Sequence, residues 1–206
     1  MARYAFFSFC YEDVKSFKVN VVRNSWLLNH SKESFIDGSI WEKEKSKGVG
    51  VIKDLIEGGL NKTSVTAILI GDETAERRWV KYEIIKSFER GNGILAIHIN
   101  RIRGKDQYIS VKGINPLERL GFRISDDGKK ISFYELINRK WTPFADLTEI
   151  NNKKSNTIYF EDGWFSNDFG KFFKFSDKFK TYCWVTDDGH KVFSKWVDSA
   201  ANEAGR

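Results

Sequence analysis

Runs of consecutive apolar residues mark the strands that this sequence predicts. Residues 4–9, 65–70 and 94–99 are almost uninterrupted apolar runs, which is typical of strands buried on both faces of a sheet. Residues 130–135 supply a further predicted strand, and residues 34–38 a short strand or a loop. The pattern therefore predicts a sheet whose central strands are fully enclosed.

Helical spacing of apolar residues appears first over residues 13–28. Asp13 is suited to cap the start of such a helix. The apolar positions are Val14, Phe17, Val21 and Leu28, with Val22 and Trp26 beside them. We predict one continuous amphipathic helix here.

Two more helices are predicted between the apolar runs. The first covers residues 52–60, closing near Gly58 and Gly59, and the second covers roughly residues 76–90, where a Gly-Asn-Gly sequence stops it. Strands and helices thus alternate, which favours an α/β fold with a parallel sheet covered on both faces. We predict a flavodoxin-like fold with a central, mostly parallel five-stranded sheet flanked by helices.

The chain changes character near its middle. Residues 1–135 carry the alternating pattern, whereas residues 136–206 are rich in Trp, Phe and Lys, with a turn at 187–189 and a helix over 191–197. The length of 206 residues suits one domain with an extension. We predict a domain over 1–135 and an aromatic-rich extension over 136–206 packed on it.

The charge balance argues against a nucleic-acid binder. The formal net charge is +6, which fits a basic surface for an anionic partner or a soluble face with surplus lysine. Lysine and acidic residues alternate along most of the chain instead of forming a basic block, so we favour the second interpretation. A mildly basic cleft would also suit a small molecule that carries phosphate.

Cysteine and histidine positions predict no metal site. Cys10 and Cys183 are far apart, and the three histidines lack ligand spacing. His98 lies inside a predicted strand and is interpreted as a structural histidine with satisfied hydrogen bonds. The sequence shows neither a signal peptide nor an apolar run of the ~20 residues that a membrane helix requires. We expect a cytoplasmic protein with reduced thiols and no membrane partner.

The sequence RRWVKYE, residues 77–83, places Trp79 and Glu83 four positions apart on the third predicted helix. Val80, Ile84 and Phe88 form the stripe that would face the sheet, so Trp79 and Glu83 would stand at the edge of the buried face, within reach of a cleft. An ordinary exposed ion pair between Glu83 and Lys86 is the alternative, and spacing alone favours it.

Further strings resemble a known family. The start YAFFSFCYED, the strand VTAILIG and the spacing Trp-x-x-x-Glu resemble TIR domains, the last being similar to that of bacterial TIR enzymes that consume NAD. The strings VNVVRNSW, GGLNKTSVTAILIG, RRWVKYEI, GNGILAIHIN, NPLERLG and YCWVTDDGHKVFSKWV are similar to the TIR-like component of the Thoeris antiphage system, the ThsB type. The resemblance spans nearly the whole chain.

This resemblance implies an NAD-consuming signalling enzyme with Glu83 as its catalytic carboxylate. It implies a cyclic ADP-ribose isomer as product, which activates a partner NAD hydrolase effector, and a phage-derived trigger. NAD is then substrate, and no cofactor or metal is implied. TIR enzymes often complete their site across two protomers, so a homo-oligomer is a further expectation.

Substrate-binding positions carried over from the family are Phe6, Asp37, Trp79 and Asn115. Each has a structural alternative: Phe6 as strand core, Asp37 in a turn with Gly38, Trp79 as a boundary residue, and Asn115 as a turn initiator before Pro116. The charged loop at residues 31–48 is expected to shape the cleft. The functional alternative to the enzyme is a TIR module that acts only by assembling with other TIR surfaces.

Overall fold

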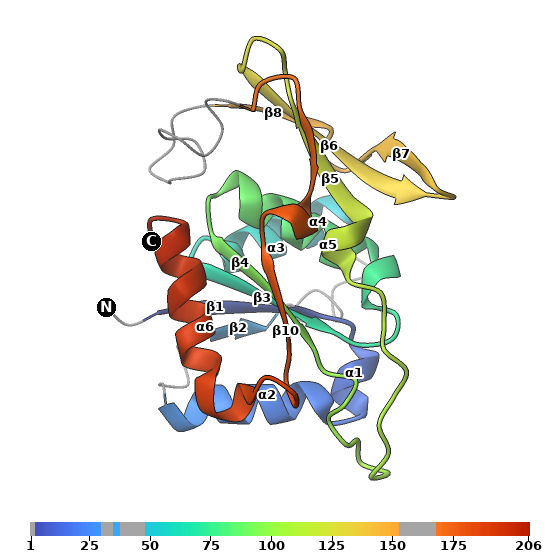
Figure 1. Ribbon diagram of the computed structural model, residues 1–206, viewed down its shortest axis with the longest axis vertical. Coiled ribbons are helices and arrows are strands. Elements are labelled where there is room, and N and C mark those ends of the chain that lie inside the picture. The colour runs from blue at the N-terminus through green and yellow to red at the C-terminus, as the bar shows by residue number, and fades with distance from the viewer. Residues whose placement is uncertain (1–2, 30–34, 38–47, 153–167) are drawn as a thin grey trace.

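The computed structural model describes residues 3–29, 35–37, 48–152 and 168–206. A five-stranded sheet lies at its centre (Figure 1), and every neighbouring pair in it is parallel. In spatial order its strands are β10 (Lys180–Cys183), β4 (Gly93–His98), β3 (Val65–Ile70), β1 (Ala5–Phe9) and β2 (Phe35–Asp37). This order is the flavodoxin-like one, so the predicted fold class is confirmed.

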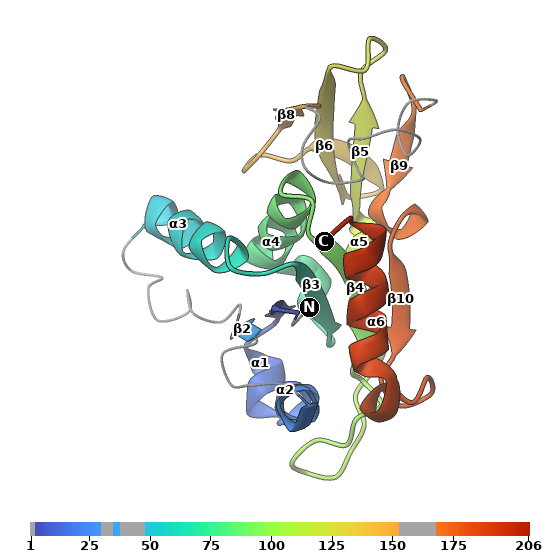
Figure 2. The same ribbon diagram turned by 90° about the vertical axis from the view of Figure 1, so that its left-hand side faces the viewer.

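Two layers of helices cover the sheet, as Figure 2 shows. On one face lie α3 (Val49–Leu60) and α4 (Arg78–Glu89), which follows the short 3₁₀ turn η3 (Thr74–Glu76). On the other face lie α2 (Lys18–Asn29) and α6 (Gly189–Glu203). Since β1, β3 and β4 are buried along their whole length, the sheet has an apolar core on each side.

The helix predicted over residues 13–28 is broken in two. The single turn α1 (Glu12–Lys15) ends before Phe17, whose φ of 67° is left-handed, and α2 starts at Lys18. This break shifts the helical phase, so Val19, Val22 and Trp26 face the core while Leu28 is 86% exposed. Of the apolar positions that predicted this helix, Val22 and Trp26 are buried, whereas Phe17, Val21 and Leu28 are exposed. Asp13 lies within α1, not at its N-cap.

A second, antiparallel sheet follows β4 in the chain and stands above α4 in Figure 1. Its strands are β7 (Lys140–Pro143), β6 (Lys130–Ile137), β5 (Leu120–Ile124) and β9 (Phe172–Lys174), with β8 (Glu149–Asn151) also paired to β6. The short helix α5 (Pro116–Arg119) leads into it, and η4 (Phe175–Asp177) leads out. The predicted strand at 130–135 therefore exists as part of β6, in this second sheet.

The two sheets do not divide the chain at residue 135. That position lies inside β6, and the second sheet begins at Leu120. The fifth strand of the parallel sheet is β10, and α6 covers the face beside it. The last elements of the chain thus belong to the first sheet.

Aromatic rings join the second sheet to α4. The ring of Phe88 on α4 lies 4.9 Å from that of Phe122 on β5 and 5.8 Å from that of Phe133 on β6. Phe175 of η4 completes the cluster at 5.4 Å from Phe88. Ring pairs at such distances add to ordinary apolar burial. The high aromatic content therefore serves a core that α4 shares with both sheets.

Within the described residues, no helix has both the length and the apolar character needed to cross a bilayer.

Candidate active site

The strand order places a topological switch point at β1. The chain leaves β1 for β2 on one side and then returns to β3 on the other. In open parallel sheets, ligands bind in the crevice outside the carboxyl ends of the strands at such a point. The residues that follow β1 and β3, and those of α4 above them, are therefore the first place to look for a site.

Glu83 of α4 points at β1. Its side chain is buried, with 1% exposure, and its Oε2 accepts a hydrogen bond of 2.5 Å from the hydroxyl of Ser8. Ser8 is the one polar residue within β1 and is itself fully buried. A buried carboxylate is retained only where polar partners hold it, so this pair is a built feature of the α4–β1 contact.

The predicted position of Glu83 at the edge of the buried face needs correction. Val80, Ile84 and Phe88 are buried as predicted, but Glu83 is enclosed too, because its side chain turns toward Ser8 of β1. The predicted pair with Lys86 does not form. Lys86 instead contacts Glu57 at 3.3 Å and also Glu89.

Trp79 occupies the first turn of α4 and is half-buried. Its ring lies edge-on to that of Tyr82, with centroids 6.0 Å apart, and the guanidinium of Arg78 sits 4.7 Å from its centroid. A flat aromatic surface with a cation beside it is suited to stack against a nucleobase or pyridine ring.

Asp146, in the loop between β7 and β8, fixes the start of α4. Its carboxylate accepts two hydrogen bonds from Arg78, of 2.6 and 2.7 Å, and lies 3.1 Å from Nζ of Lys53 on α3. The hydrogen bonds from Arg78 are the main cause that holds the pKa of Asp146 below its usual value. The second sheet thereby clamps both helices above the site.

Phe6 lies two residues before Ser8 on the same face of β1 and is buried beneath α3. A Cβ placed on Gly59 of α3 would fall 3.0 Å from the Phe6 ring, a contact tighter than most real Cβ contacts, so glycine favours this close approach. Beside this contact is a pocket of about 630 Å³, here called the α3 pocket, which Asp37, Gly59 and Lys62 help to line. Phe6 forms core in this structure.

Asp37 ends β2 and forms an ion pair with Arg23 of α2. In the parallel register Asp37 pairs with Phe7, whereas Ile36 pairs with Phe6, so the Asp37 side chain points toward α2. Glu83 lies on the opposite face. The structure thus brings Phe6, Trp79 and Glu83 to one face and leaves the Asp37 carboxylate on the other.

Asn115 lies at the far edge of the sheet from Asp37. Its Oδ1 caps α5 by accepting from the backbone N–H of Leu117 at 3.0 Å, and its Nδ2 donates to Thr181 of β10 at 2.9 Å. Because β10 and β2 are the two edge strands, four strand spacings of about 4.8 Å separate these positions. The structure does not bring Asn115 to Glu83.

A cluster at the carboxyl ends of β1 and β3 was not among the predicted site residues. The carboxylate of Asp13 packs against Gly71, where any Cβ would collide with it. Burial raises the pKa of Asp13 to about 6. Nε of Arg77 donates to Sγ of Cys10 at 3.1 Å. The polar Ser8 inside an apolar run was the sequence signal for this region, since such a residue needs a partner.

The charged loop at residues 31–48 was expected to shape the cleft. This stays a prediction, because residues 31–34 and 38–47 lie outside the described residues. Within the described residues, no group of three or more His, Cys, Asp or Glu side chains could hold a metal ion.

Comparison with known proteins agrees with this arrangement. Residues 6–103 match the family model described as "Thoeris protein ThsB, TIR-like domain". The chain is also 45% identical over 202 residues to the "Putative cyclic ADP-D-ribose synthase ThsB1" of Bacillus cereus (strain MSX-D12), covering 96% of this chain and 100% of that protein. This chain belongs to the Thoeris ThsB family. Its TIR-like region, residues 6–103, runs from β1 through β4 and contains Ser8 and Glu83. The match to Bacillus cereus ThsB1 extends across the residues that form the second sheet in this chain.

Proposed function

We propose that this ThsB-family protein is an NAD-consuming TIR enzyme that removes nicotinamide from NAD and joins the remaining ADP-ribose into a cyclic isomer. The observation that carries this proposal is the 45% identity, along nearly the whole chain, to a protein named as a putative cyclic ADP-D-ribose synthase. The structure supports it with a carboxylate held at the switch point of a parallel sheet, where ligands of such folds bind.

Glu83 is the catalytic carboxylate of the proposal. Nicotinamide departs as a neutral molecule when the bond from its nitrogen to ribose breaks, and positive charge develops on the ribose ring. A negative carboxylate close to that ring stabilises the charge, as in glycoside hydrolysis. Ser8 is a positioning residue, because its hydrogen bond sets the direction of Oε2.

Substrate contacts are proposed for three further residues. Trp79 offers a half-exposed ring for stacking, and Phe6 backs the wall under Gly59. Asp37 borders the α3 pocket at the end of β2, although its carboxylate pairs with Arg23 on the other face, and the pocket's 630 Å³ is in the range for a small-molecule site. Asn115 would join them only across an assembly of two copies, because it stands at the opposite edge of the sheet.

Cyclisation requires that an atom of ADP-ribose, and not water, attacks the ribose carbon. The enclosure of Glu83 between α4 and β1 favours this outcome, since water is excluded from a buried site. We further propose that the product acts as a diffusible signal for an NAD hydrolase effector of the same defence system, after a phage-derived trigger.

The test is NAD turnover in lysate of phage-infected cells, followed by chromatography with mass detection. We expect nicotinamide and a product of cyclic ADP-ribose mass with the native protein, and loss of both with Glu83→Gln. The matched control is Glu89→Gln on the same helix, which removes an acid that pairs with Lys86 and should leave turnover unchanged.

A TIR module that acts only by assembly is the second candidate, and one observation favours it. Glu83 is 1% exposed, so NAD cannot reach it until the residues over it move. Unchanged NAD with soluble, folded protein in infected lysate, together with self-association on sizing, would support that candidate over the enzyme.

A further inference from the structure

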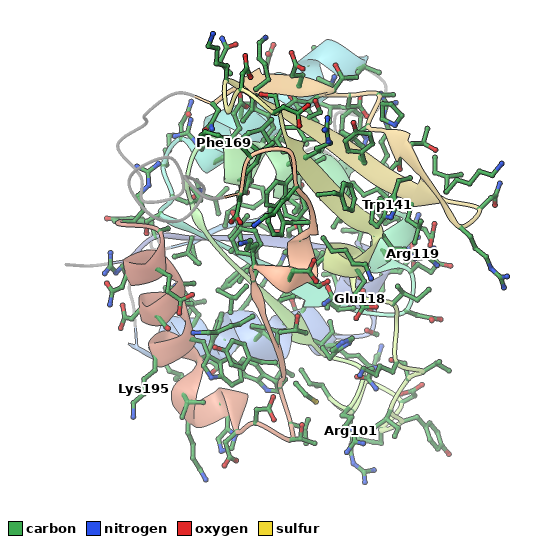
Figure 3. The ribbon with its side chains drawn as sticks, turned by 45° about the horizontal axis from the view of Figure 1, so that its top comes forward. Arg101, Glu118, Arg119, Trp141, Phe169 and Lys195 are labelled. Atoms are coloured by element: carbon green, nitrogen blue, oxygen red, sulfur yellow. The ribbon has the colours of Figure 1, made fainter. Side chains whose placement is uncertain are left out.

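A second pocket, here called the β10 pocket, lies at the edge of the sheet away from Glu83. It has a volume of about 710 Å³ and is walled by β10, by the end of β4, and by the segments around α5 and η4. Glu118, which Figure 3 labels, belongs to its α5 wall. None of the groups proposed above for catalysis lies in it except Asn115.

His98 and Cys183 lie side by side in this pocket. They are register partners on the parallel strands β4 and β10, so their side chains leave the sheet on the same face. Thr181, two residues before Cys183, contacts Asn115 on that face, whereas Tyr182 between them stacks on Trp196 of α6 on the other. Both His98 and Cys183 line the β10 pocket.

His98 carries an unmet hydrogen-bonding atom. The residue is 7% exposed, and its Nδ1 has no partner within the described part of the chain. Burial lowers the pKa of His98 to about 4, so the ring is neutral at neutral pH and Nδ1 can accept a hydrogen bond. Within the described residues, the predicted hydrogen bonding of His98 is therefore incomplete at Nδ1. A buried polar atom without a partner calls for a ligand group, here an N–H or O–H donor.

Cys183 differs from Cys10 in its surroundings. Burial acts to raise the pKa of the Cys183 thiol, but hydrogen bonds from the Thr186 hydroxyl and from the backbone N–H groups of Thr186 and Val185 bring it below its usual value. Cys10 is buried, and that burial raises the pKa of its thiol. Since the thiolate is the reactive form, only Cys183 combines access with thiolate character.

Lys112 supplies a free positive charge at the same place. Its ammonium makes no ion pair with any described residue, and its charge acts on His98. Lys178 and Lys180 also line the pocket but pair with Asp168 and Glu203. The pocket thus offers a thiol, a neutral acceptor and an available cation.

We propose that the β10 pocket is a modification site, at which Cys183 forms a mixed disulfide with a small peptide-like disulfide of the glutathione class. The amide N–H groups of such a molecule meet Nδ1 of His98, and its carboxylates meet Lys112. The Cys183 thiolate attacks one sulfur of the disulfide, a new S–S bond forms, and the original S–S bond breaks. Cys183 is oxidised, the departing half leaves as a reduced thiolate, and that thiolate takes a proton from water.

The test is incubation of the full chain with oxidised glutathione, followed by intact mass and peptide mapping. We expect one glutathione per chain, located on Cys183, retained in Cys10→Ser and absent from Cys183→Ser. Modification of Cys10 at the same rate as Cys183, or no adduct on Cys183 in excess reagent, would overturn the proposal. The readout needs no NAD, so it is independent of the proposed catalytic function.

Recognition by the pocket is separated from simple thiol reactivity by a second reagent. Diethyl disulfide has no carboxylate, amide or hydroxyl group, so it offers nothing to Lys112 or to Nδ1 of His98. We expect Lys112→Gln and His98→Phe each to slow the glutathione reaction about five-fold, the scale of one hydrogen bond, and to leave the diethyl disulfide reaction unchanged. Equal slowing of both reagents, or of neither, would refute a built site.

Discussion

Ser8 and Glu83 are 75 positions apart in sequence, yet they form a 2.5 Å hydrogen bond inside the core. The hydroxyl is fixed by a central strand and the carboxylate by the second turn of a helix, so neither group can turn away without losing its partner. The carboxylate proposed for catalysis is therefore held by the framework itself.

Ser8→Ala removes this hydrogen bond and leaves the buried Oε2 of Glu83 without it. We expect the free energy of unfolding to fall by about 1–3 kcal/mol and NAD turnover to fall by about 10- to 100-fold, because a small misplacement of a reacting group has effects of that size. Urea unfolding measures the change in stability, and nicotinamide release measures the change in turnover.

Thr66→Val is the matched control for that variant. It removes another buried hydroxyl, which lies 2.7 Å from the hydroxyl of Ser87. A similar loss of stability with unchanged turnover is expected. Equal loss of turnover in both variants would mean that Ser8 acts only through stability.

Asp146→Asn tests the clamp on α4. The neutral amide of asparagine would make no ion pair with Arg78 or Lys53. We therefore expect the free energy of unfolding to fall by about 2–3 kcal/mol at neutral pH. The pKa of Asp146 is lowered in the folded protein, so its stabilisation is present above the unfolded pKa of 3.8 and is lost as pH falls through the lowered folded pKa. The difference between native and variant protein should shrink below about pH 4. Glu149→Gln, at an exposed pair with Lys130, should change stability by less than about 1 kcal/mol.

Asp13→Asn should stabilise the protein at neutral pH, in contrast to Asp146→Asn. Burial raises the pKa of Asp13 from 3.8 to about 6, so the folded state holds its proton more tightly than the unfolded state does. Stability from this group is present below about pH 4 and is lost as pH rises to about 6. The variant should therefore match native stability at pH 4 and exceed it by about 2–3 kcal/mol above pH 6. A variant that is less stable at every pH would contradict the raised pKa.

Phe88→Ala tests the aromatic junction between the two sheets. Removing this fully buried ring should reduce the free energy of unfolding by about 3–5 kcal/mol. Trp141→Ala should reduce the free energy of unfolding by clearly less. The Trp141 ring is only half-buried and packs against the ring of Phe172 in the second sheet. Calorimetry of both variants would show whether α4 and the second sheet unfold together.

The sequence predicts elements whose pattern lies within their own residues, and it misses those that depend on contacts with distant residues. The apolar runs of β1, β3 and β4 decide their own burial, so the positions of these three strands follow from them. The strand β10 reads Lys-Thr-Tyr-Cys, which has no strand pattern, and it forms because β4 offers an unpaired edge. The helix break at Phe17 depends on a single left-handed residue, which apolar periodicity does not report.

For the site, helical spacing and family resemblance directed attention to Trp79 and Glu83. Spacing could not show that Glu83 is enclosed, because its partner Ser8 on β1 is 75 positions away in sequence. Nor could it show that Asp37 and Glu83 occupy opposite faces, since that depends on the register of β1 with β2.

The place of β10 and α6 in the parallel sheet has a consequence for synthesis on the ribosome. Until the last residues emerge, one edge of β4 lacks its neighbour, and the apolar side chains of Leu95 and Ile97 lack the helix that covers them. A chain released early would expose an open strand edge, which promotes aggregation. Only a chain translated through α6 therefore has a closed core, and a product that stops before β10 is expected to aggregate instead of folding.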